Sequence, residues 1–257
     1  MPTNSLEMQP PTNKLRPRTR RSKSLLNLLL CAAVLVTGVT FGPAWSAEPL
    51  RIGIIGTGKI GGALARHWAA AGHHLVISSR HPERLESLAR ELGPRVRTGT
   101  PAEAAEFGEV VLVSVPYGAM PQIGRDYAGL MRGKVVLDTG NPFLGRDGPM
   151  AEQAQRKGAG IASAEFLPGV RLVRAFNCIP AYTLASQAGR RPERIAIPIA
   201  SDDKAALEVA ARLVDDAGFD AVIVGDLERS RAFDLGQPLA RGNLSAAELQ
   251  RLVDAHR

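Results

Sequence analysis

Residues 51–84 read RIGIIGTGKIGGALARHWAAAGHHLVISSRHPER, and this stretch decides how the rest of the chain is interpreted. A β-branched run ends at Gly56, and a pattern with helical spacing follows it. Gly56, Gly58 and Gly61 complete the spacing G-x-G-x-x-G between the two. In that context the first glycine permits a tight turn, the second lets the backbone approach a pyrophosphate, and the third lets the helix pack against the strand. The stretch therefore predicts a dinucleotide-binding βαβ unit.

The turn and the start of the helix are expected to hold the pyrophosphate. Backbone N–H groups at a helix N-terminus lack intrahelical partners and lie at the positive end of the helix dipole. The residues expected to contact the cofactor here are Gly56, Thr57, Gly58, Lys59, Ile60 and Gly61, with the Thr57 hydroxyl as an additional donor. The alternative is a glycine-rich turn that binds no ligand.

The end of the second strand predicts which dinucleotide binds. An NAD-specific site has Asp or Glu there to accept a hydrogen bond from the ribose 2′-OH, whereas this chain has Ser79. The Ser79 hydroxyl and the guanidinium groups of Arg80 and Arg84, with His81 beside them, would instead bind a 2′-phosphate. We therefore expect NADP as the cofactor. The alternative is that both arginines are ordinary solvated charges.

Short apolar runs alternate with helical patterns from Leu50 onward. This alternation predicts an α/β fold, a Rossmann-type doubly wound and mostly parallel sheet with helices on both faces. Strands are expected at residues 50–56, 73–79, 95–100, 109–116, 134–143, 169–180, 194–201 and 219–227. Helices are expected at residues 59–72, 81–93, 101–108, 117–133, 202–218 and 245–257, with caps at Thr100 and Ser245. Residues 47–257 are thus predicted to form one domain with a short C-terminal helical extension.

The ligand of such a sheet lies over the carboxyl ends of the strands, near the point where the strand order reverses. Three strand ends are expected to face that crevice: Ser114, Val115, Pro116 and Tyr117; Asp138, Asn141 and Pro142; and Phe176, Asn177 and Cys178. The first should flank the adenosine and the riboses, and the other two the nicotinamide. Asn141 and Asn177 are candidates to bond a carboxamide or a substrate oxygen. The alternative for each is a turn residue bonded to its own backbone.

The other reactive side chains favour no further chemistry. His67, His73, His74 and His81 lack acidic or cysteine partners at ligand spacing, so no metal site is expected. Cys178 has no paired histidine in the pattern and is expected to be a small buried residue. There is no Ser-His-Asp order and no nucleophile elbow, and no catalytic residue is assigned.

Residues 1–46 have the pattern of an export signal. The basic segment TRRSKS precedes an uncharged run from Leu25 to Phe41 and the small-residue exit GPAWSAEP, which predicts cleavage after Ser46 and a periplasmic location. Arg20 and Arg21 suggest the twin-arginine route, and an uncleaved membrane anchor is the alternative. Six of the 32 basic residues and one of the 25 acidic residues lie in this leader, which leaves residues 47–257 with a net charge of +2. A nucleic-acid partner is therefore not expected, and neither is stable membrane insertion once the signal is cleaved.

Six segments in this order resemble the NADPH-dependent deazaflavin (coenzyme F-420) reductases: IGIIGTGKIGGALA, ISSRHPERL, EVVLVSVPYGAMP, VVLDTGNPF, VRAFN and VGDLERSRAFD. The same module occurs in the cytosolic domain of the six-transmembrane metalloreductases. The resemblance implies a Rossmann fold, NADP binding and direct hydride transfer to a small flavin-like acceptor, and a homodimer is left open. Thr57, Ser79, Arg80 and Arg84 match positions that hold the nucleotide in that family, whereas His81 stands where a second arginine is common.

Direct transfer between two redox cofactors requires no dedicated acid or base, because the protein mainly positions two rings face to face. Two alternatives stay open. One is a protein that carries NADP without turnover, as a structural or sensing ligand. The other is an imine reductase similar to pyrroline-5-carboxylate reductase, which needs a helical dimerisation domain, although few residues follow Gly236 here.

Overall fold

The structure is a computed structural model that describes residues 48–256. The predicted signal peptide, residues 1–46, lies outside the described residues. Ala47–Arg257 forms one compact unit. None of the helices in residues 48–256 is both long and apolar enough to cross a membrane.

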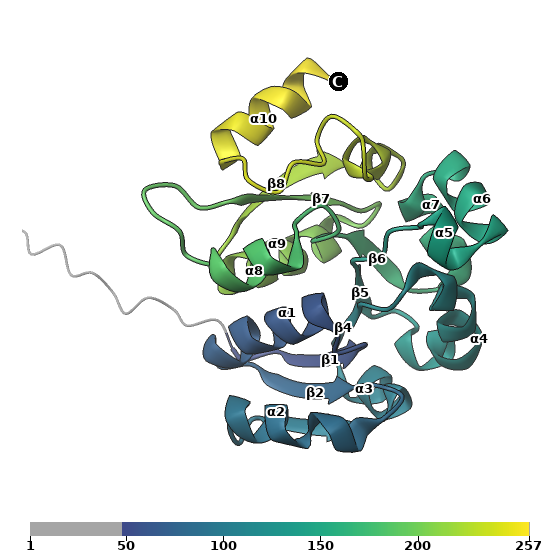
Figure 1. The fold of residues 1–257 in the computed structure, drawn as a ribbon, viewed down its shortest axis with the longest axis vertical. Helices are drawn as coiled ribbons and strands as arrows, with labels where there is room; N and C mark the ends of the chain where they lie inside the picture. The colour runs from purple at the N-terminus through teal and green to yellow at the C-terminus, as the bar shows by residue number, and fades with distance from the viewer. Residues whose placement is uncertain (1–47, 257) are drawn as a thin grey trace, which may run out of the picture. The chain divides into compact units, whose positions relative to one another are not determined.

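Eight strands form one sheet in the order β3-β2-β1-β4-β5-β6-β7-β8 (Figure 1). Their bounds are β1 Arg51–Ile55, β2 His74–Ser78, β3 Val96–Gly99, β4 Val110–Val113, β5 Val135–Asp138, β6 Arg171–Arg174, β7 Ala196–Ala200 and β8 Asp220–Gly225. Strands β1 to β6 are parallel to one another, β7 is antiparallel to β6, and β8 is parallel to β7. The strand order reverses between β1 and β4, so the carboxyl ends of these two strands form the switch point. The predicted doubly wound, mostly parallel sheet is confirmed, and each predicted strand range contains one strand.

The helices cover both faces of the sheet. Their bounds are α1 Lys59–Ala70, α2 Glu86–Leu92, α3 Pro101–Phe107, α4 Met120–Met131, α5 Leu144–Asp147, α6 Pro149–Lys157, α7 Ala159–Phe166, α8 Ala181–Ser186, α9 Lys204–Asp216 and α10 Ala246–Ala255. The 3-10 turns are η1 Pro82–Leu85, η2 Tyr117–Ala119 and η3 Glu228–Phe233. One core joins the sheet to α1, α2, α8 and α9, and a second joins it to α3, α4, α6 and α7. A third, smaller core packs η3 and α10 on β7 and β8.

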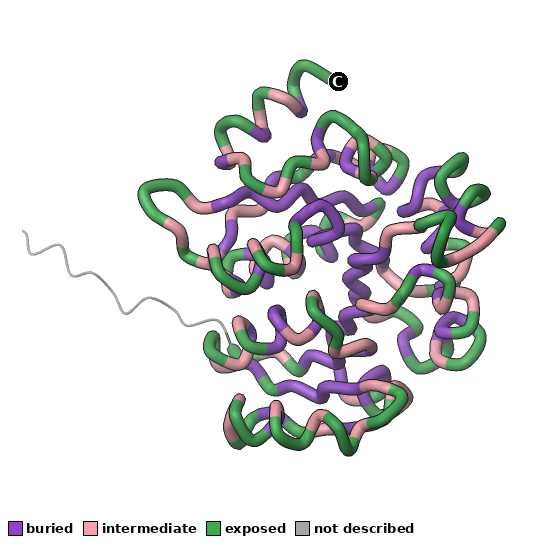
Figure 2. The backbone as a smooth tube through the Cα atoms, in the orientation of Figure 1, coloured by how far each residue is buried: buried purple, intermediate pink, exposed green. Residues whose placement is uncertain are grey.

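Apolar strand sequences explain the position of the sheet between these layers. The four residues of β4, VVLV, are all buried, as expected for a parallel strand that is covered on both faces. The strands form the buried centre of the domain in Figure 2. On one face the fully buried Trp68 of α1 donates a hydrogen bond from Nε1 to Leu213 O of α9 at 2.8 Å. This bond ties together two helices that are far apart in the sequence.

The helical pattern predicts some elements less well. The predicted helices at 81–93 and 117–133 each begin with a 3-10 turn, η1 and η2, and the α-helices α2 and α4 follow these turns. No element is predicted for residues 144–168, where the structure has α5, α6 and α7. Helix α7, AGIASAEF, is rich in small residues and buries several of them, so it has no amphipathic stripe to detect. The capping box predicted at Ser245 is present, with Ser245 N donating to Glu248 Oε2 at 2.8 Å.

Candidate functional site

The glycine turn after β1 has the geometry that pyrophosphate binding requires. Gly56 has φ +96°, and a Cβ there would lie 2.3 Å from Ser114 O. A Cβ on Gly61 would lie 2.2 Å from Gly56 O, whereas a Cβ on Gly58 would meet nothing within 4 Å. Packing therefore requires the first and third glycines. The second faces open space, where a pyrophosphate can approach the backbone.

The start of α1 presents unpaired N–H groups to the same space. Gly58 makes no side-chain cap, and the first turn contains no acidic residue. The first i→i−4 bond runs from Gly62 N to Gly58 O at 2.8 Å, so the N–H groups of Lys59, Ile60 and Gly61 have no intrahelical acceptor. Together with the helix dipole, they favour an anion at this end.

The carbonyl oxygen of Ser78, at the end of β2, accepts three hydrogen bonds from the glycine turn. The donors are Gly56 N at 3.2 Å, Thr57 N at 3.0 Å and Thr57 Oγ1 at 3.0 Å. The hydroxyl hydrogen of Thr57 is thus engaged by the protein, in contrast to the expectation that it donates to the pyrophosphate. Thr57 instead joins the turn to the strand end that precedes Ser79.

A cavity of about 500 Å³ lies in front of this turn. It brings together eight of the predicted site residues: Gly56, Thr57, Gly58, Ser79, Arg80, Ser114, Val115 and Pro116. Pro101, Ala119 and Ile123 add an apolar wall that sequence reasoning missed, and such a wall suits an adenine ring. The volume is typical of small-molecule sites, about 300–1,000 Å³. Lys59, Ile60 and Gly61 follow the turn at the start of α1. His81 precedes η1 and Arg84 lies within it, and neither residue lines the cavity.

The strand end at Ser79 carries positive charge that the protein leaves uncompensated. Ser79 Oγ accepts a hydrogen bond from His81 N at 3.0 Å, so its own hydrogen is available to a ligand. Among residues 48–256, neither the Arg80 nor the Arg84 side chain has a hydrogen-bond or ion-pair partner, and both residues are exposed. His81 Nδ1 lies 3.4 Å from Glu83 Oε1. The Ser79 hydroxyl and the two guanidinium groups fit the 2′-phosphate of NADP, and the residue that follows β2 is a serine and not the carboxylate that would repel that phosphate.

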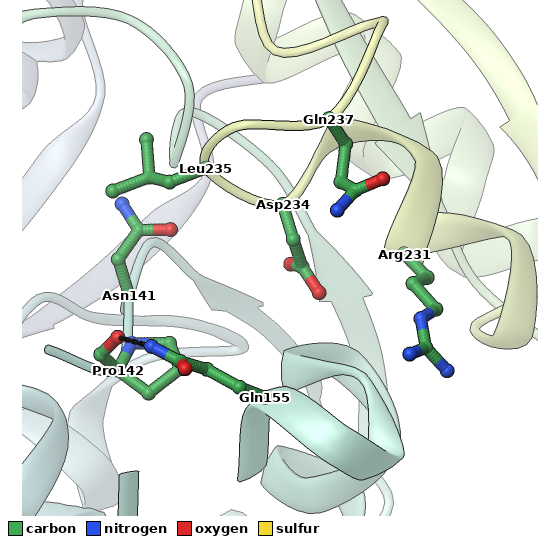
Figure 3. A pocket seen from close by; sticks show the side chains of 7 residues that line it. All are labelled: Asn141, Pro142, Gln155, Arg231, Asp234, Leu235 and Gln237. Atoms are coloured by element: carbon green, nitrogen blue, oxygen red, sulfur yellow. Dashed lines mark hydrogen bonds between the residues drawn. The ribbon is translucent and has the colours of Figure 1, made fainter. Parts of the chain in front are cut away.

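A second, polar pocket of about 210 Å³ lies beyond the end of β5 (Figure 3). It is lined by Asn141, Pro142, Gln155, Arg231, Asp234, Leu235 and Gln237. Asp234 lies between Asn141 and Arg231, and Gln155 donates to Pro142 O at 2.8 Å. Thr139 Oγ1 donates to Ser114 Oγ at 3.1 Å, which joins the end of β5 to the end of β4. The two pockets therefore lie over neighbouring strand ends.

The two predicted asparagines hold this region together. Asn141 Nδ2 donates to Asn177 O at 2.7 Å, and Asn177 Nδ2 donates to Phe233 O at 2.9 Å. Both side chains bond across segments rather than to their own turns. Asn141 lines the second pocket, whereas Asn177 is buried and its Oδ1 has no partner within residues 48–256. Asn177 lines neither pocket, so of the two predicted asparagines the structure presents only Asn141 to a ligand.

Three residues expected at the crevice lie in the interior instead, and Cys178 is buried as predicted. Tyr117, Asp138 and Phe176 are almost fully buried, and the Tyr117 hydroxyl donates to Ala159 O at 2.9 Å. Cys178 is also buried, and burial raises the pKa of its thiol to about 12. Both faces of the sheet are covered by helices, so side chains at the strand ends are buried whichever face they point to. These strand ends contribute their backbone and neighbouring residues to the crevice.

Sequence reasoning missed a buried ion-pair cluster behind the second pocket. Arg174 Nη1 lies 2.7 Å from Asp138 Oδ2, and Arg174 Nη2 lies 3.2 Å from Asp234 Oδ1. The Arg174 and Asp138 side chains are fully buried. The signal for this cluster is present in the sequence, because an arginine inside the apolar run LVRAF requires a buried carboxylate partner. Asp234 and Arg231 carry no such signal, because Arg231 lies in the short turn η3 and Asp234 directly follows it, outside any apolar run.

Within the described part of the chain, no group of three or more His, Cys, Asp or Glu side chains is placed to hold a metal ion.

Comparisons with known proteins agree with this geometry. The profile of the family described as NADP oxidoreductase, coenzyme F420-dependent, matches residues 51–142. The F420-dependent NADP reductase of Methanothermobacter marburgensis is 33% identical over 204 residues, which cover 74% of this chain and 90% of that protein. The crystal structure of a hypothetical protein from Sinorhizobium meliloti has a TM-score of 0.63 at 26% identity and covers 78% of this chain and 97% of that one. A putative F420-dependent NADP reductase from an Arthrobacter species shares the fold, with a TM-score of 0.55 at 21% identity over 71% of this chain and 88% of that one.

Proposed function

Because this chain belongs to the family of coenzyme F420-dependent NADP oxidoreductases, we propose that it transfers a hydride between NADPH and a small acceptor of deazaflavin or flavin type. The chain is an NADP-dependent oxidoreductase, and the acceptor is the part that we propose. The observation that carries the proposal is the pair of pockets over neighbouring strand ends. One pocket is built for a phosphorylated dinucleotide, and the other continues along the same edge of the sheet.

The residues of the chain bind and orient the reactants in this proposal. When NADPH is bound, its nicotinamide supplies the hydride, and the acceptor gains that hydride together with a proton from solvent. The glycine turn and the start of α1 hold the pyrophosphate, and Ser79 and Arg80 hold the 2′-phosphate. Asn141 lines the second pocket, on the side where the nicotinamide end would extend, and Asn177 O holds its amide in place. No side chain is required to act as a general acid or base.

Gly58→Leu is the variant that tests this assignment. The backbone at Gly58 is extended, with φ −82°, so leucine is compatible with the fold, and its side chain would project into the open space of the pyrophosphate site. We expect the variant to fold normally and to lose NADPH binding and oxidation. Gly62→Ala is the matched control, because a Cβ there meets only Thr57 Cγ2 at 3.9 Å.

Anaerobic NADPH oxidation should be followed with coenzyme F420, FMN, riboflavin and a ferric chelate as separate acceptors. Turnover with the deazaflavin or a flavin, absent in Gly58→Leu and retained in Gly62→Ala, supports the proposal. Turnover with the ferric chelate alone would contradict it. Tight NADPH binding without oxidation by any acceptor would instead favour a non-catalytic NADP-binding protein.

We also propose that the chain is exported, on the strength of the basic, apolar and small-residue pattern of residues 1–46. The twin-arginine route moves folded proteins, so NADP could leave the cytoplasm already bound. Mass spectrometry of protein purified natively would read the mature N-terminus and any bound nucleotide in one sample. We expect the chain to begin at Ala47. A chain that begins at Met1 or Pro2 would contradict cleavage and favour a membrane anchor.

A further inference from the structure

We propose that Arg174 is a positioning residue, whose buried guanidinium fixes the wall of the crevice where the nicotinamide and the acceptor meet. The inference rests on the proposed function, because it assigns a role within the same crevice. Arg174 ends β6 and contacts no solvent, so it acts through the segments that it holds.

The first of these segments is the loop after β5. Gly140 N donates to Asp138 Oδ1 at 2.7 Å, and Gly140 O accepts from Arg174 Nη1 at 2.7 Å. The same nitrogen lies 2.7 Å from Asp138 Oδ2. The buried ion pair therefore holds both sides of the peptide backbone at Gly140. Asn141, the next residue, lines the second pocket, so its position is set by this pair.

The second segment is the loop after η3. Arg174 Nη2 donates to Asp234 Oδ1 at 3.2 Å, and Asp234 Oδ2 accepts from Ala159 N at 3.0 Å. The preceding carbonyl, Phe233 O, accepts the hydrogen bond from Asn177 Nδ2. One guanidinium thus joins three parts of the crevice: the Asn141 loop, Asn177 and the Asp234 loop. Figure 3 shows Asn141 and Asp234 on facing sides of the second pocket.

Stability alone does not account for this cluster. A buried ion pair is often no more stabilising than well-packed apolar residues of similar volume, because desolvation offsets the Coulomb attraction. Arg174 Nε and Asn177 Oδ1 are also buried without a hydrogen-bond partner in residues 48–256, and they lie three residues apart at this one place. The one other such atom, Arg194 Nε, lies 3.2 Å from Asp220 Oδ1 in an ion pair. Apolar residues could fill the space of the cluster, but they could not hold Gly140 and Asp234.

The backbone next to Arg174 is strained in the same region. Phe176 has φ +59°, the one positive φ of a non-glycine residue among residues 48–256. It directly precedes Asn177, so the strained residue sets where that amide lies. Strain of this kind persists only where the surrounding contacts fix the backbone. Here Asn177 bonds to Asn141 and to Phe233 O, and Arg174 holds the residues next to both of these partners.

The test compares Arg174→Met and Arg174→Lys with the control Arg171→Met. Arg171 begins the same strand and forms an ion pair with Asp203 through Nε at 2.6 Å and Nη2 at 3.0 Å, at the end of β6 away from the crevice. Three quantities are measured: the affinity for 2′-phospho-ADP-ribose, which lacks nicotinamide; the fluorescence emission of bound NADPH; and kcat with the active acceptor.

For Arg174→Met we expect unchanged affinity for 2′-phospho-ADP-ribose, a shift of bound NADPH emission toward that of free NADPH, and a kcat lower by about tenfold to a hundredfold. The last figure follows because misplacement by about 1 Å can lower a rate about a hundredfold. Arg174→Lys should be intermediate, and Arg171→Met should match the unmodified protein in all three quantities. Unchanged emission and kcat in Arg174→Met would overturn the proposal. So would a loss of affinity for 2′-phospho-ADP-ribose as large as the loss for NADPH, which is read from titration of the NADPH emission.

If Arg174→Met does not fold, Asp234→Asn gives the same test from a partly exposed partner, 17% exposed. Its emission and kcat should change in the same direction, and unchanged values would overturn the proposal. The emission measurement needs no turnover. If none of the acceptors supports oxidation of NADPH, the proposed function is refuted. The fluorescence of bound NADPH would still decide the role of Arg174.

Discussion

Alanine at both Arg80 and Arg84 should remove the preference for NADPH over NADH while the domain stays folded. Neither guanidinium has a hydrogen-bond or ion-pair partner among residues 48–256, and both residues are exposed. Surface substitutions of this kind change the free energy of unfolding by about 0.5 kcal/mol or less. A loss of NADPH affinity in this variant can therefore be assigned to the site and not to unfolding.

The size of the effect follows from the contacts that are available. A hydrogen bond to a charged group contributes about 1.5–3 kcal/mol, and the exposure of both arginines places each near the lower end. Two such bonds give about 3 kcal/mol, which is about a hundredfold in the dissociation constant of NADPH. Arg80 lines the cavity and Arg84 does not, so Arg80→Ala alone should cause the larger part of the loss. NADH has no 2′-phosphate, and its affinity should not change.

The assay is titration of each variant with NADPH and with NADH at low and at moderate salt. Arg90→Ala is the matched control, because it removes the same charge from α2, where Arg90 Nε contacts only Glu86 O of its own helix at 3.4 Å. The control should keep the preference of the unmodified protein. An unchanged ratio of NADPH to NADH affinity in the double variant would refute the assignment of the 2′-phosphate site. A stronger salt dependence for NADPH than for NADH should accompany the unmodified site.

Three further outcomes are expected. Gly61→Ala should weaken NADPH binding and lower the melting temperature, because its Cβ would lie 2.2 Å from Gly56 O; a variant with unaltered values of both would contradict the packing role. The Cys178 thiol should react with a disulfide reagent only after unfolding, since burial raises its pKa to about 12, and rapid labelling of the native protein would show otherwise. Burial lowers the pKa of His73 from its usual 6.5, so the unfolded state binds a proton first as the pH falls, and the free energy of unfolding should decrease below about pH 6.5. His73→Asn should reduce that decrease in acid unfolding curves; an equally steep decrease in the variant would assign it to other groups.

The sheet is the part of the fold that the sequence predicts best. Its strands are short apolar runs bounded by glycine or polar residues, and the alternation with helices leaves few topologies for a parallel sheet. Helix α7 is different, because its stability comes from burial of small side chains such as Ala159 and Ala162 in the second core. That burial depends on residues far away in the sequence and has no local periodicity.

The two pockets differ in the same way: local sequence specifies one of them, and contacts between distant segments build the other. The cofactor cavity is built largely from one βαβ unit and the turn after β4, so its glycines, Ser79 and Arg80 can be found from local spacing. The second pocket combines residues from α6, the loop after β5 and the segment after β8. Gln155 and Asp234 come together because η3 packs against α7, which directly follows α6, and no local pattern specifies that packing. Asn177 could be found as a candidate, but its burial and its bonds to Asn141 and Phe233 depend on segments far away in the sequence.

The three hydrogen bonds to the Ser78 carbonyl oxygen fix the glycine turn after β1 relative to residues 79–84, the segment that would bind the 2′-phosphate. Because the acceptor is a main-chain atom, every side chain from residue 79 to residue 84 can be exchanged without breaking that joint. Cofactor preference in this fold can therefore change in evolution, or be redesigned, while the geometry of the pyrophosphate site stays the same.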